Sequence, residues 1–320
     1  MEHLSPSRRY AILGTGAIGG YYGACLQQGG CDVHFLARSD YDHIRTHGLQ
    51  VDSPDGGFTL PSVQVYASVD HMPRCDVIVV ALKTTQNHFL ETLLPPLLTA
   101  ESTVLLLQNG LDVEVHVADL VGDRRRVMGG LCFICSNKVG PGHIQHLDYK
   151  AIAIGEYAQN YAPAGISDEL EAIAQDFEAV GIPIIRADDL LRARWKKLLW
   201  NIPFNGLSVI LNATTDQMIH HPEARQLSED LIDEVRAIAA AYDRVIDDHD
   251  VDKMLADTET MKPYRTSMKL DFEHQREMEV DAIFGNPLKA AKLKGIPTPK
   301  LEALYQQLTF LNQIHSRSDG

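Results

Sequence analysis

Three polar side chains recur at four-residue intervals within an apolar segment of the sequence, namely Lys197, Asn201 and Asn205. On a helix, the spacing i, i+4 and i+8 places them on one stripe and leaves the neighbouring apolar side chains to bury the helix. Amides can hydrogen-bond a polar substrate, and an ammonium group can donate a proton. The stripe therefore predicts a wet pocket with a general acid. A surface stripe with a snorkelling lysine fits the spacing equally well.

A glycine-rich GxGxxG motif lies near the N-terminus and comprises Gly14, Thr15, Gly16, Ala17, Ile18 and Gly19. It follows an apolar run at 10–13 and opens a helix predicted to reach Gln28, which is the context of a dinucleotide site. Gly14 would permit a tight turn, Gly16 would let backbone approach a pyrophosphate, and Gly19 would let the helix pack on the strand. The alternative is a plain glycine-rich turn between a strand and a helix.

The residues just after the second predicted strand bear on which dinucleotide binds. NAD-binding sites place a carboxylate there for the ribose hydroxyls. This chain instead has Arg38, which can form charge-assisted bonds to a 2′-phosphate. The sequence therefore predicts NADPH/NADP+ as cofactor, and the nearby Asp40 and Asp42 are the features that could weaken this preference.

Two further polar residues follow predicted strands, where open α/β sheets bind their ligands. Lys83 follows the run at 77–82, and Asn109 follows the run at 104–107. Each could be an ordinary solvent-facing loop residue. Because both stand at ligand-facing strand ends, we favour contact with the cofactor.

The elements that must position these groups form two predicted domains. Residues 1–187 alternate short apolar runs with helical patterns, which is typical of an α/β Rossmann-type dinucleotide-binding domain with buried parallel strands. Its predicted strands are 10–13, 33–36, 77–82, 104–107, 131–135 and 184–185, with a hairpin around 140–142 and a helix at 167–180. Residues 188–320 show helical periodicity only, which predicts an all-helical substrate and catalytic domain.

Composition narrows the class of partner. With 29 Lys and Arg against 43 Asp and Glu, the 320-residue chain has a formal charge of −14. This argues against nucleic acid or an anionic membrane surface and favours a small-molecule ligand. No apolar run approaches the ~18–20 residues of a membrane-spanning helix. Together with scattered cysteines, this predicts a cytoplasmic protein without membrane partners.

Two eye-catching patterns are interpreted structurally rather than as metal sites. Cys132 and Cys135 form a CxxC within an apolar run, which indicates a buried strand because no second pair completes a zinc site. His220 and His221 are adjacent and point in different directions on a helix, so we expect a helix entry before Pro222. No metal is therefore predicted.

Taken in order, these motifs carry a family resemblance that spans residues 9 to about 312. The sequence resembles the 2-dehydropantoate 2-reductases, also called ketopantoate reductases, in its GxGxxG motif with Arg38, Ala81-Leu82-Lys83, Gln108-Asn109-Gly110, Trp195-Lys196-Lys197-Leu198 with two asparagines at four-residue intervals, and Ser267 twelve residues before Glu279. The resemblance implies NADPH-dependent reduction of a 2-keto acid in pantothenate and coenzyme A biosynthesis. It also implies a C-terminal domain like that of 6-phosphogluconate dehydrogenase.

The resemblance also implies roles for individual residues. Lys197 matches the general acid, and Glu279 would contact the cofactor and orient the site. Asn201, Asn205 and Ser267 match substrate-binding residues, and Asn109 would touch both cofactor and substrate. The whole GxGxxG motif, Arg38, Lys83 and Cys135 match cofactor contacts; at Cys135 the contact would come from backbone.

Departures from the family pattern concern the substrate wall. Tyr264 and Thr215 stand where relatives often have asparagines, with Asn212 as a stand-in for the second, and Gln275 opens a segment that is usually Gly-Arg-Pro-Thr-Glu. A different 2-keto or hydroxy acid on the same scaffold is therefore an alternative. A third hypothesis is an NADP(H) sensor without turnover. The apolar series from Leu301 to Leu311 is either core or the face of a homodimer.

Overall fold

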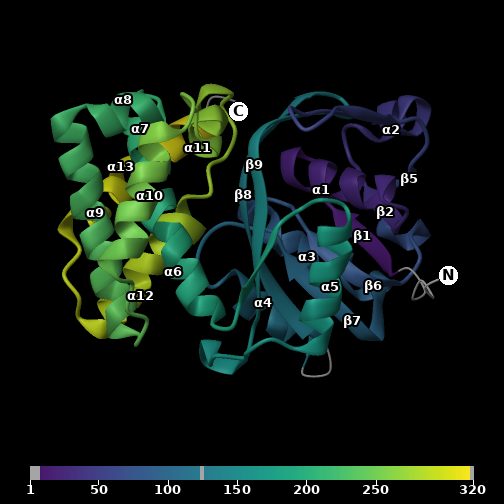
Figure 1. The fold of residues 1–320 in the computed structure, drawn as a ribbon, viewed down its shortest axis with the longest axis horizontal. Helices are drawn as coiled ribbons and strands as arrows, with labels where there is room; N and C mark the ends of the chain where they lie inside the picture. The colour runs from purple at the N-terminus through teal and green to yellow at the C-terminus, as the bar shows by residue number, and fades with distance from the viewer. Residues whose placement is uncertain (1–7, 123–125, 318–320) are drawn as a thin grey trace. The chain divides into compact units, whose positions relative to one another are not determined.

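The computed structural model describes residues 8–122 and 126–317 of the chain (Figure 1). By packing, the chain divides into two compact units. The first runs to Gln108 and continues from Val113 to Leu190. The second comprises Asn109–Asp112 and the chain from Leu191 onward. The short Asn109–Asp112 segment therefore packs with the helical unit although both of its flanks belong to the sheet unit.

The first unit is built on one mixed sheet in the order β4-β3-β9-β8-β7-β6-β1-β2-β5, with β10 added beside β9. Its strands are β1 (Arg9–Leu13), β2 (Asp32–Leu36), β3 (Leu49–Asp52), β4 (Phe58–Leu60), β5 (Gln64–Tyr66), β6 (Cys75–Val80), β7 (Leu98–Leu106), β8 (Arg126–Gly140), β9 (His143–Glu156) and β10 (Ile184–Ala187). The strands from β8 through β5 in this order run parallel, whereas β8 and β9 pair antiparallel as two long neighbours (Figure 1). This confirms the predicted Rossmann-type sheet.

Alternate side chains of the central strands enter two separate cores, one on each face of the sheet. One core takes Tyr10 and Ile12, and the other takes Ala11 and Leu13. The first is covered by α1 (Ala17–Gln28) and α5 (Asp168–Ala179), and the second by α3 (Leu90–Leu93) and α4 (Val113–Val121). Burial on both faces explains why these strands are continuous apolar runs in the sequence.

The predicted strands are present, with shifted ends. The run at 77–82 lies in a strand that ends at Val80, and the two runs after the 140–142 turn belong to the single strand β9. The CxxC lies in β8, as expected of a strand. Strands β3, β4 and β5 were not predicted, because they are short and carry polar or exposed residues at alternate positions, so they lack an apolar run.

The second unit is helical, as predicted. Its helices are α6 (Leu190–Trp200), α7 (Gly206–Ile210), α8 (Thr215–His220), α9 (Pro222–Ala241), α10 (Asp248–Thr260), α11 (Ser267–Glu273), α12 (Asn286–Lys294) and α13 (Pro299–Arg317). Two π-helical turns interrupt this pattern, η5 (Asn201–Asn205) and η6 (Asp281–Gly285), and they contact each other. Pro222 opens α9, which supports the structural interpretation of the two histidines before it.

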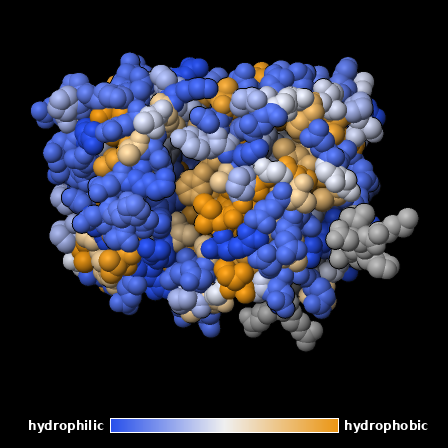
Figure 2. Space-filling view, in the orientation of Figure 1, coloured by the Kyte–Doolittle hydropathy of each residue, from blue (hydrophilic) through white to orange (hydrophobic). Residues whose placement is uncertain are grey.

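The distribution of polar and apolar residues agrees with the charged composition of the sequence. Hydrophilic residues cover most of the face drawn in Figure 2, and hydrophobic residues show in smaller patches. Among the described residues, no helix is long and apolar enough to span a membrane, and no group of three His, Cys, Asp or Glu side chains could hold a metal ion. Leu301, Leu304 and Leu308 of α13 are buried, so these members of the C-terminal apolar series belong to the core.

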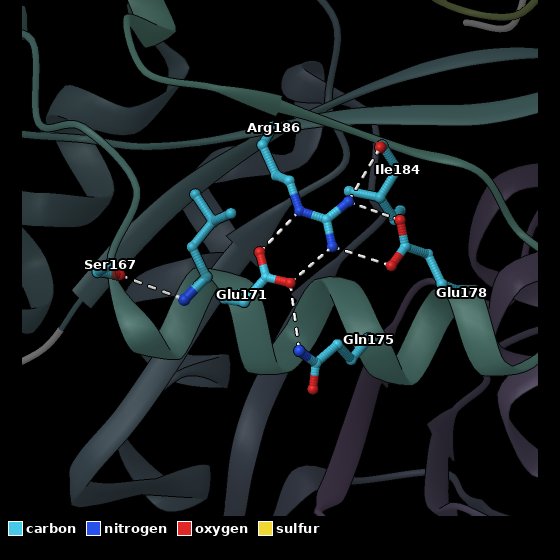
Figure 3. A network of polar contacts seen from close by, with 7 residues as sticks. Ser167, Glu171, Gln175, Glu178, Ile184 and Arg186 are labelled. Atoms are coloured by element: carbon cyan, nitrogen blue, oxygen red, sulfur yellow. Dashed lines mark hydrogen bonds and ion pairs between the residues drawn. The ribbon is translucent and has the colours of Figure 1, made fainter.

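A bidentate ion-pair network ties α5 to β10 (Figure 3). Arg186 donates from Nε and Nη2 to Glu171 at 2.7 and 2.8 Å, and from Nη1 and Nη2 to Glu178 at 2.6 and 2.9 Å. Gln175 also donates to Glu171. These bonds from Arg186, followed by the bond from Gln175, lower the pKa of Glu171 from 4.5 to about 2. The network therefore stabilises the fold at pH values at which Glu171 is ionised.

This network predicts a pH-dependent difference in stability between wild type and Arg186→Gln. Because the folded-state pKa of Glu171 is depressed, its contribution is complete above pH ~4.5 and is lost as pH falls through about 2. Thermal melting should show a lower midpoint for R186Q at pH 6, and the gap should close as pH approaches 2. Arg186→Lys keeps the charge but not the paired hydrogen bonds of the guanidinium, so its melting temperature should lie between those of wild type and R186Q. A gap that is constant across this range would contradict the assignment.

Candidate active site

A cleft of about 560 Å³ opens in the first unit where β1 and β2 end. Its volume lies within the usual range of small-molecule sites. It is lined by Gly14, Thr15, Gly16, Leu36, Ala37, Arg38, Ser39, Asp40, Ala67, Ser68, Val69, Asp70, Leu82, Gln86, Phe89, Thr92, Leu93 and Lys138. Four of the predicted cofactor residues, Gly14, Thr15, Gly16 and Arg38, therefore meet in one cleft at the carboxyl end of the parallel strands, where α/β sheets bind nucleotides.

The three motif glycines have different surroundings. Gly14 has a φ of +100°, and a Cβ there would lie 2.9 Å from the Ala81 carbonyl carbon. A Cβ on Gly19 would lie 2.1 Å from the Gly14 oxygen, so the helix could not pack this closely with a side chain there. Gly16 faces open space within 4 Å, and α1 begins after it with no side-chain cap and no acidic residue in its first turn. Its first N–H groups are thus available to an anion.

The loop after β2 presents positive charge to this cleft. Arg38 is exposed, and its guanidinium lies 5.3 Å from the centre of the Phe89 ring. Asp42 is also exposed and pairs with Arg45. Asp40, by contrast, is buried and ion-paired with Lys138 at 2.6 Å. The carboxylate that could have weakened NADP(H) binding is therefore neutralised.

The other predicted cofactor residues of this unit lie outside the cleft lining. Lys83 precedes the short 3₁₀ segment η2 (Thr84–Phe89) and is half-buried. Ala17 and Ile18 begin α1. Cys135 lies on β8 beside irregular pairing, and burial, then the nearby Asp148, raise the pKa of its thiol to about 12. The adjacent Ser136 donates to the Ala17 carbonyl at 3.2 Å, which ties this strand to the start of α1.

In the second unit, the predicted polar stripe lies at the end of α6 and in the π turn that follows. Lys197 is half-buried in the last turn of α6. Asn201 and Asn205 are only 4% and 2% exposed. Within the described residues, Asn201 Nδ2 and Asn205 Oδ1 are buried without a hydrogen-bond partner. Because an unpaired buried polar atom is costly, these two atoms fit a site completed by a polar ligand.

The π turn corrects the assumption of a regular α-helical stripe. Four α-helical residues rotate about 40° past a full turn, so Lys197 and Asn205 would drift apart on a regular helix. The wider turn at Asn201–Asn205 rotates each residue less and reverses this drift. Pro203 lies inside it and lacks the N–H that an α turn would use. The stripe is therefore straighter than the sequence spacing implied.

Hydrogen bonds link the asparagine turn to the predicted substrate serine. Ser208 donates to the Asn205 carbonyl at 2.9 Å, and its hydroxyl lies 2.8 Å from that of Thr266. Thr266 caps α11 by accepting from the Lys269 N–H at 3.2 Å. Both hydroxyl residues are fully buried, and Ser267, the exposed first residue of α11, follows directly. The substrate-binding candidates Asn205 and Ser267 are thus connected through a buried bridge.

A second set of contacts holds Asn109 and the segment after Glu279. The Leu111 N–H donates to the Ala282 carbonyl at 2.9 Å, and Asn286 Nδ2 donates to the Leu111 carbonyl at 2.8 Å. Gly110, at a φ of +104°, approaches Ala282 so closely that a Cβ would lie 2.6 Å from it. The π turn η6 therefore anchors Asn109, which is half-buried, and begins two residues after the half-buried Glu279.

The residues that depart from the family pattern form a supporting structure. Thr215 is fully buried and exchanges hydrogen bonds with the backbone of Tyr264. Asn212 accepts from the buried Lys269 ammonium at 2.5 Å, so its carboxamide oxygen already has a partner within the fold. Gln275 has a φ of 56° and lies in an exposed turn. Thr215 and Asn212 are thus held by hydrogen bonds within the helical unit.

Comparison with known proteins settles the family. The family model "Ketopantoate reductase PanE/ApbA" matches residues 10–159, and its C-terminal counterpart matches residues 189–312. This chain belongs to the ketopantoate reductase family. It is 54% identical over 305 residues to a 2-dehydropantoate 2-reductase of Nostoc sp. (strain PCC 7120), with 95% of each chain covered.

Solved structures support the same family. The 2-dehydropantoate 2-reductase of Geobacter metallireducens shares 40% identity with a TM-score of 0.89, covering 94% of this chain and 99% of that one. The enzyme of Methylococcus capsulatus shares 32% identity with a TM-score of 0.86, covering 96% and 98%. Both similarities extend across the sheet unit and the helical unit of this chain.

Several residues around these sites carried no signal in the sequence. Phe89 lies under Arg38 but belongs to a 3₁₀ segment without clear periodicity. Lys138 reaches the cleft from β8, far from the motif in sequence. Ser208 and Thr266 are ordinary hydroxyl residues until their 2.8 Å contact is seen. A helix-capping pattern at Thr266 was the one available clue.

The anchoring of Asn109 predicts that Gly110→Ala is markedly destabilising. A non-glycine residue at this positive φ costs about 1–3 kcal/mol, and the clash with Ala282 adds to it. Gly56→Ala is the matched control, because Gly56 has a φ of +114° but open space around it. Urea denaturation should show a larger loss for G110A than for G56A. Equal losses would mean that the close approach to Ala282 contributes nothing.

Proposed function

We propose that this protein is a 2-dehydropantoate 2-reductase, which reduces ketopantoate to pantoate with NADPH in pantothenate and coenzyme A biosynthesis. The observation that carries the proposal is the stripe of Lys197, Asn201 and Asn205, in which both asparagines are buried and one amide atom of each lacks a partner among the described residues. Unpaired amides beside a lysine suit a substrate that has a keto oxygen, a carboxylate and a hydroxyl. Family membership supports the same reaction.

The proposed mechanism uses the chain for binding, orientation and proton transfer. When bound, NADPH supplies the hydride that reduces the keto carbon. Lys197 donates a proton to the keto oxygen as negative charge develops there, and Asn201 and Asn205 orient the substrate by hydrogen bonds. Ser267 and Asn109 complete substrate binding. We assign Glu279 the role of keeping Lys197 protonated, since a nearby carboxylate favours the charged ammonium.

The surroundings of the cleft support NADPH. Gly14, Thr15 and Gly16 leave an uncapped helix start for a pyrophosphate, and Arg38 offers a fork of donors to a 2′-phosphate. We extend the cofactor site to Ala17, Ile18, Gly19, Lys83, Asn109, Cys135 and Glu279 as the resemblance implies. On this proposal, residues 1–187 form the cofactor domain and residues 188–320 the substrate and catalytic domain.

A homodimer is part of the proposal. It rests on the far side of α13, where Phe310 and Ile314 are 63% and 45% exposed although Leu301, Leu304 and Leu308 of the same helix are buried. Light scattering after size exclusion should give twice the 35.5 kDa of one chain. A mass of one chain at micromolar concentration would remove this part of the proposal and leave the activity untouched.

The function is tested by following NADPH oxidation with ketopantoate and a panel of other 2-keto acids. We expect the highest kcat/KM with ketopantoate and a preference for NADPH over NADH. Faster turnover of another keto acid would replace the substrate assignment. That result would point to the Thr215–Tyr264 wall, which differs from the family pattern. Tight NADPH binding without turnover of any panel member would instead support the sensor hypothesis.

Lys197→Ala should separate catalysis from cofactor binding. We expect kcat to fall by roughly 10²–10⁴-fold, because a general acid is lost, while the Kd for NADPH changes little. Lys196→Ala is the matched control: this neighbouring lysine pairs with Asp250 at 2.7 Å. Fluorescence titration with NADPH and steady-state kinetics check both variants. Full turnover by K197A would overturn the mechanism.

A further inference from the structure

Asp40 ends the loop after β2 as a carboxylate whose oxygens are all occupied. Its side chain is only 8% exposed. Oδ1 accepts from the Ser39 hydroxyl at 2.9 Å and from Lys138 Nζ at 2.7 Å, and Oδ2 accepts from the Gly142 N–H at 3.1 Å. Burial by itself raises the pKa of Asp40, but the hydrogen bonds from Lys138, Gly142 and Ser39 outweigh it and leave that pKa below its ordinary value. Asp40 is therefore a charged, compensated group.

The compensating lysine comes from a different part of the sheet. Lys138 lies near the end of β8, whereas Arg38 and Asp40 follow β2. The turn between β8 and β9 is held firmly. The Gly142 carbonyl accepts from the Gln50 N–H at 2.9 Å, and a Cβ on Gly142 would lie 2.9 Å from the Gly48 oxygen. The β8–β9 hairpin therefore holds Lys138 against the loop that carries Arg38.

The net charge beside Arg38 affects how well a phosphate group binds in the cleft. Arg38, Asp40 and Lys138 all line the same cleft. A phosphate monoester carries about −1.5 to −2 charges at pH 7, so an uncompensated carboxylate beside it would repel it. Paired with Lys138, Asp40 adds no net charge, and the charge of Arg38 is not cancelled. Lys138 also keeps 34% of its side chain exposed, so its ammonium is not sealed away from a ligand.

We propose that Lys138 is a specificity-determining residue for NADPH over NADH. By pairing with Asp40, it removes the repulsion that this carboxylate would exert on the 2′-phosphate held by Arg38. The inference rests on the proposed use of NADPH and adds a residue, outside the loop after β2, on which that selectivity depends. Without Lys138, Asp40 would act as the carboxylate that NAD-binding sites carry near this position.

The direct test is binding of the two half-cofactors that differ only in the 2′-phosphate. Isothermal titration calorimetry should show that Lys138→Met weakens binding of 2′,5′-ADP by about tenfold, because the uncompensated Asp40 then repels the 2′-phosphate, and changes binding of 5′-AMP much less. Lys150→Met is the matched control: Lys150 lies on β9 and pairs with Asp55 at 2.7 Å, but does not line the cleft. K150M should bind both ligands as wild type does.

Two further variants distinguish charge compensation from a structural role. Lys138→Arg keeps the charge and should keep the preference. Asp40→Asn in the K138M background removes the uncompensated carboxylate and should recover much of the lost 2′,5′-ADP affinity. Equal weakening of both ligands by K138M, or no recovery in the double variant, would overturn the proposal. Thermal melting of each variant checks that the fold is intact.

Kinetics keep this inference separate from the proposed function. If wild type reduces ketopantoate with NADPH while K138M retains the full ratio of kcat/KM for NADPH over NADH, the Lys138 assignment fails and the function stands. If no keto acid is turned over but K138M loses more affinity for 2′,5′-ADP than for 5′-AMP relative to wild type, the proposed function fails and the Lys138 assignment stands.

Discussion

The constraint on which both units of this protein depend is that a buried polar group must find a partner. At Asp40 in the sheet unit, the chain itself meets this demand through Ser39, Lys138 and Gly142. In the helical unit, the demand is left open at Asn201 and Asn205. Asp40 thus has its partners within the chain, whereas one amide atom each of Asn201 and Asn205 lacks one among the described residues.

Two departures from regular α-helix lie next to the proposed active-site residues of the helical unit. The π turns at Asn201–Asn205 and Asp281–Gly285 contact each other, and each lies next to residues that we place in the active site. π turns cost hydrogen-bond geometry and are found mostly where function requires them. Here the first aligns the amides with Lys197, and the second receives the Leu111 backbone and so positions Asn109. Irregular backbone is the means by which apolar helices present polar groups.

The proposed cofactor site is built partly from consecutive residues and partly from residues distant in sequence. The glycine turn and the start of α1 form from consecutive residues and supply the anion-binding backbone. The electrostatic character of the neighbouring loop depends on Lys138, which is about a hundred residues away in sequence and is brought in by the β8–β9 pairing. On our proposal, selectivity for NADPH over NADH therefore depends on the pairing of distant strands as well as on the glycine motif.

Sequence patterns alone predict the Rossmann-type sheet, the helical second unit, the glycine turn and the spacing of Lys197, Asn201 and Asn205. Apolar runs, glycine spacing and four-residue periodicity are local consequences of burial and backbone geometry. The folded chain is needed to see that Asp40 is neutralised, that the stripe contains a π turn, and that Ser208 and Thr266 bridge Asn205 to α11. These features are contacts between residues distant in sequence, or a backbone register set by packing, and neither leaves a periodic trace in the chain.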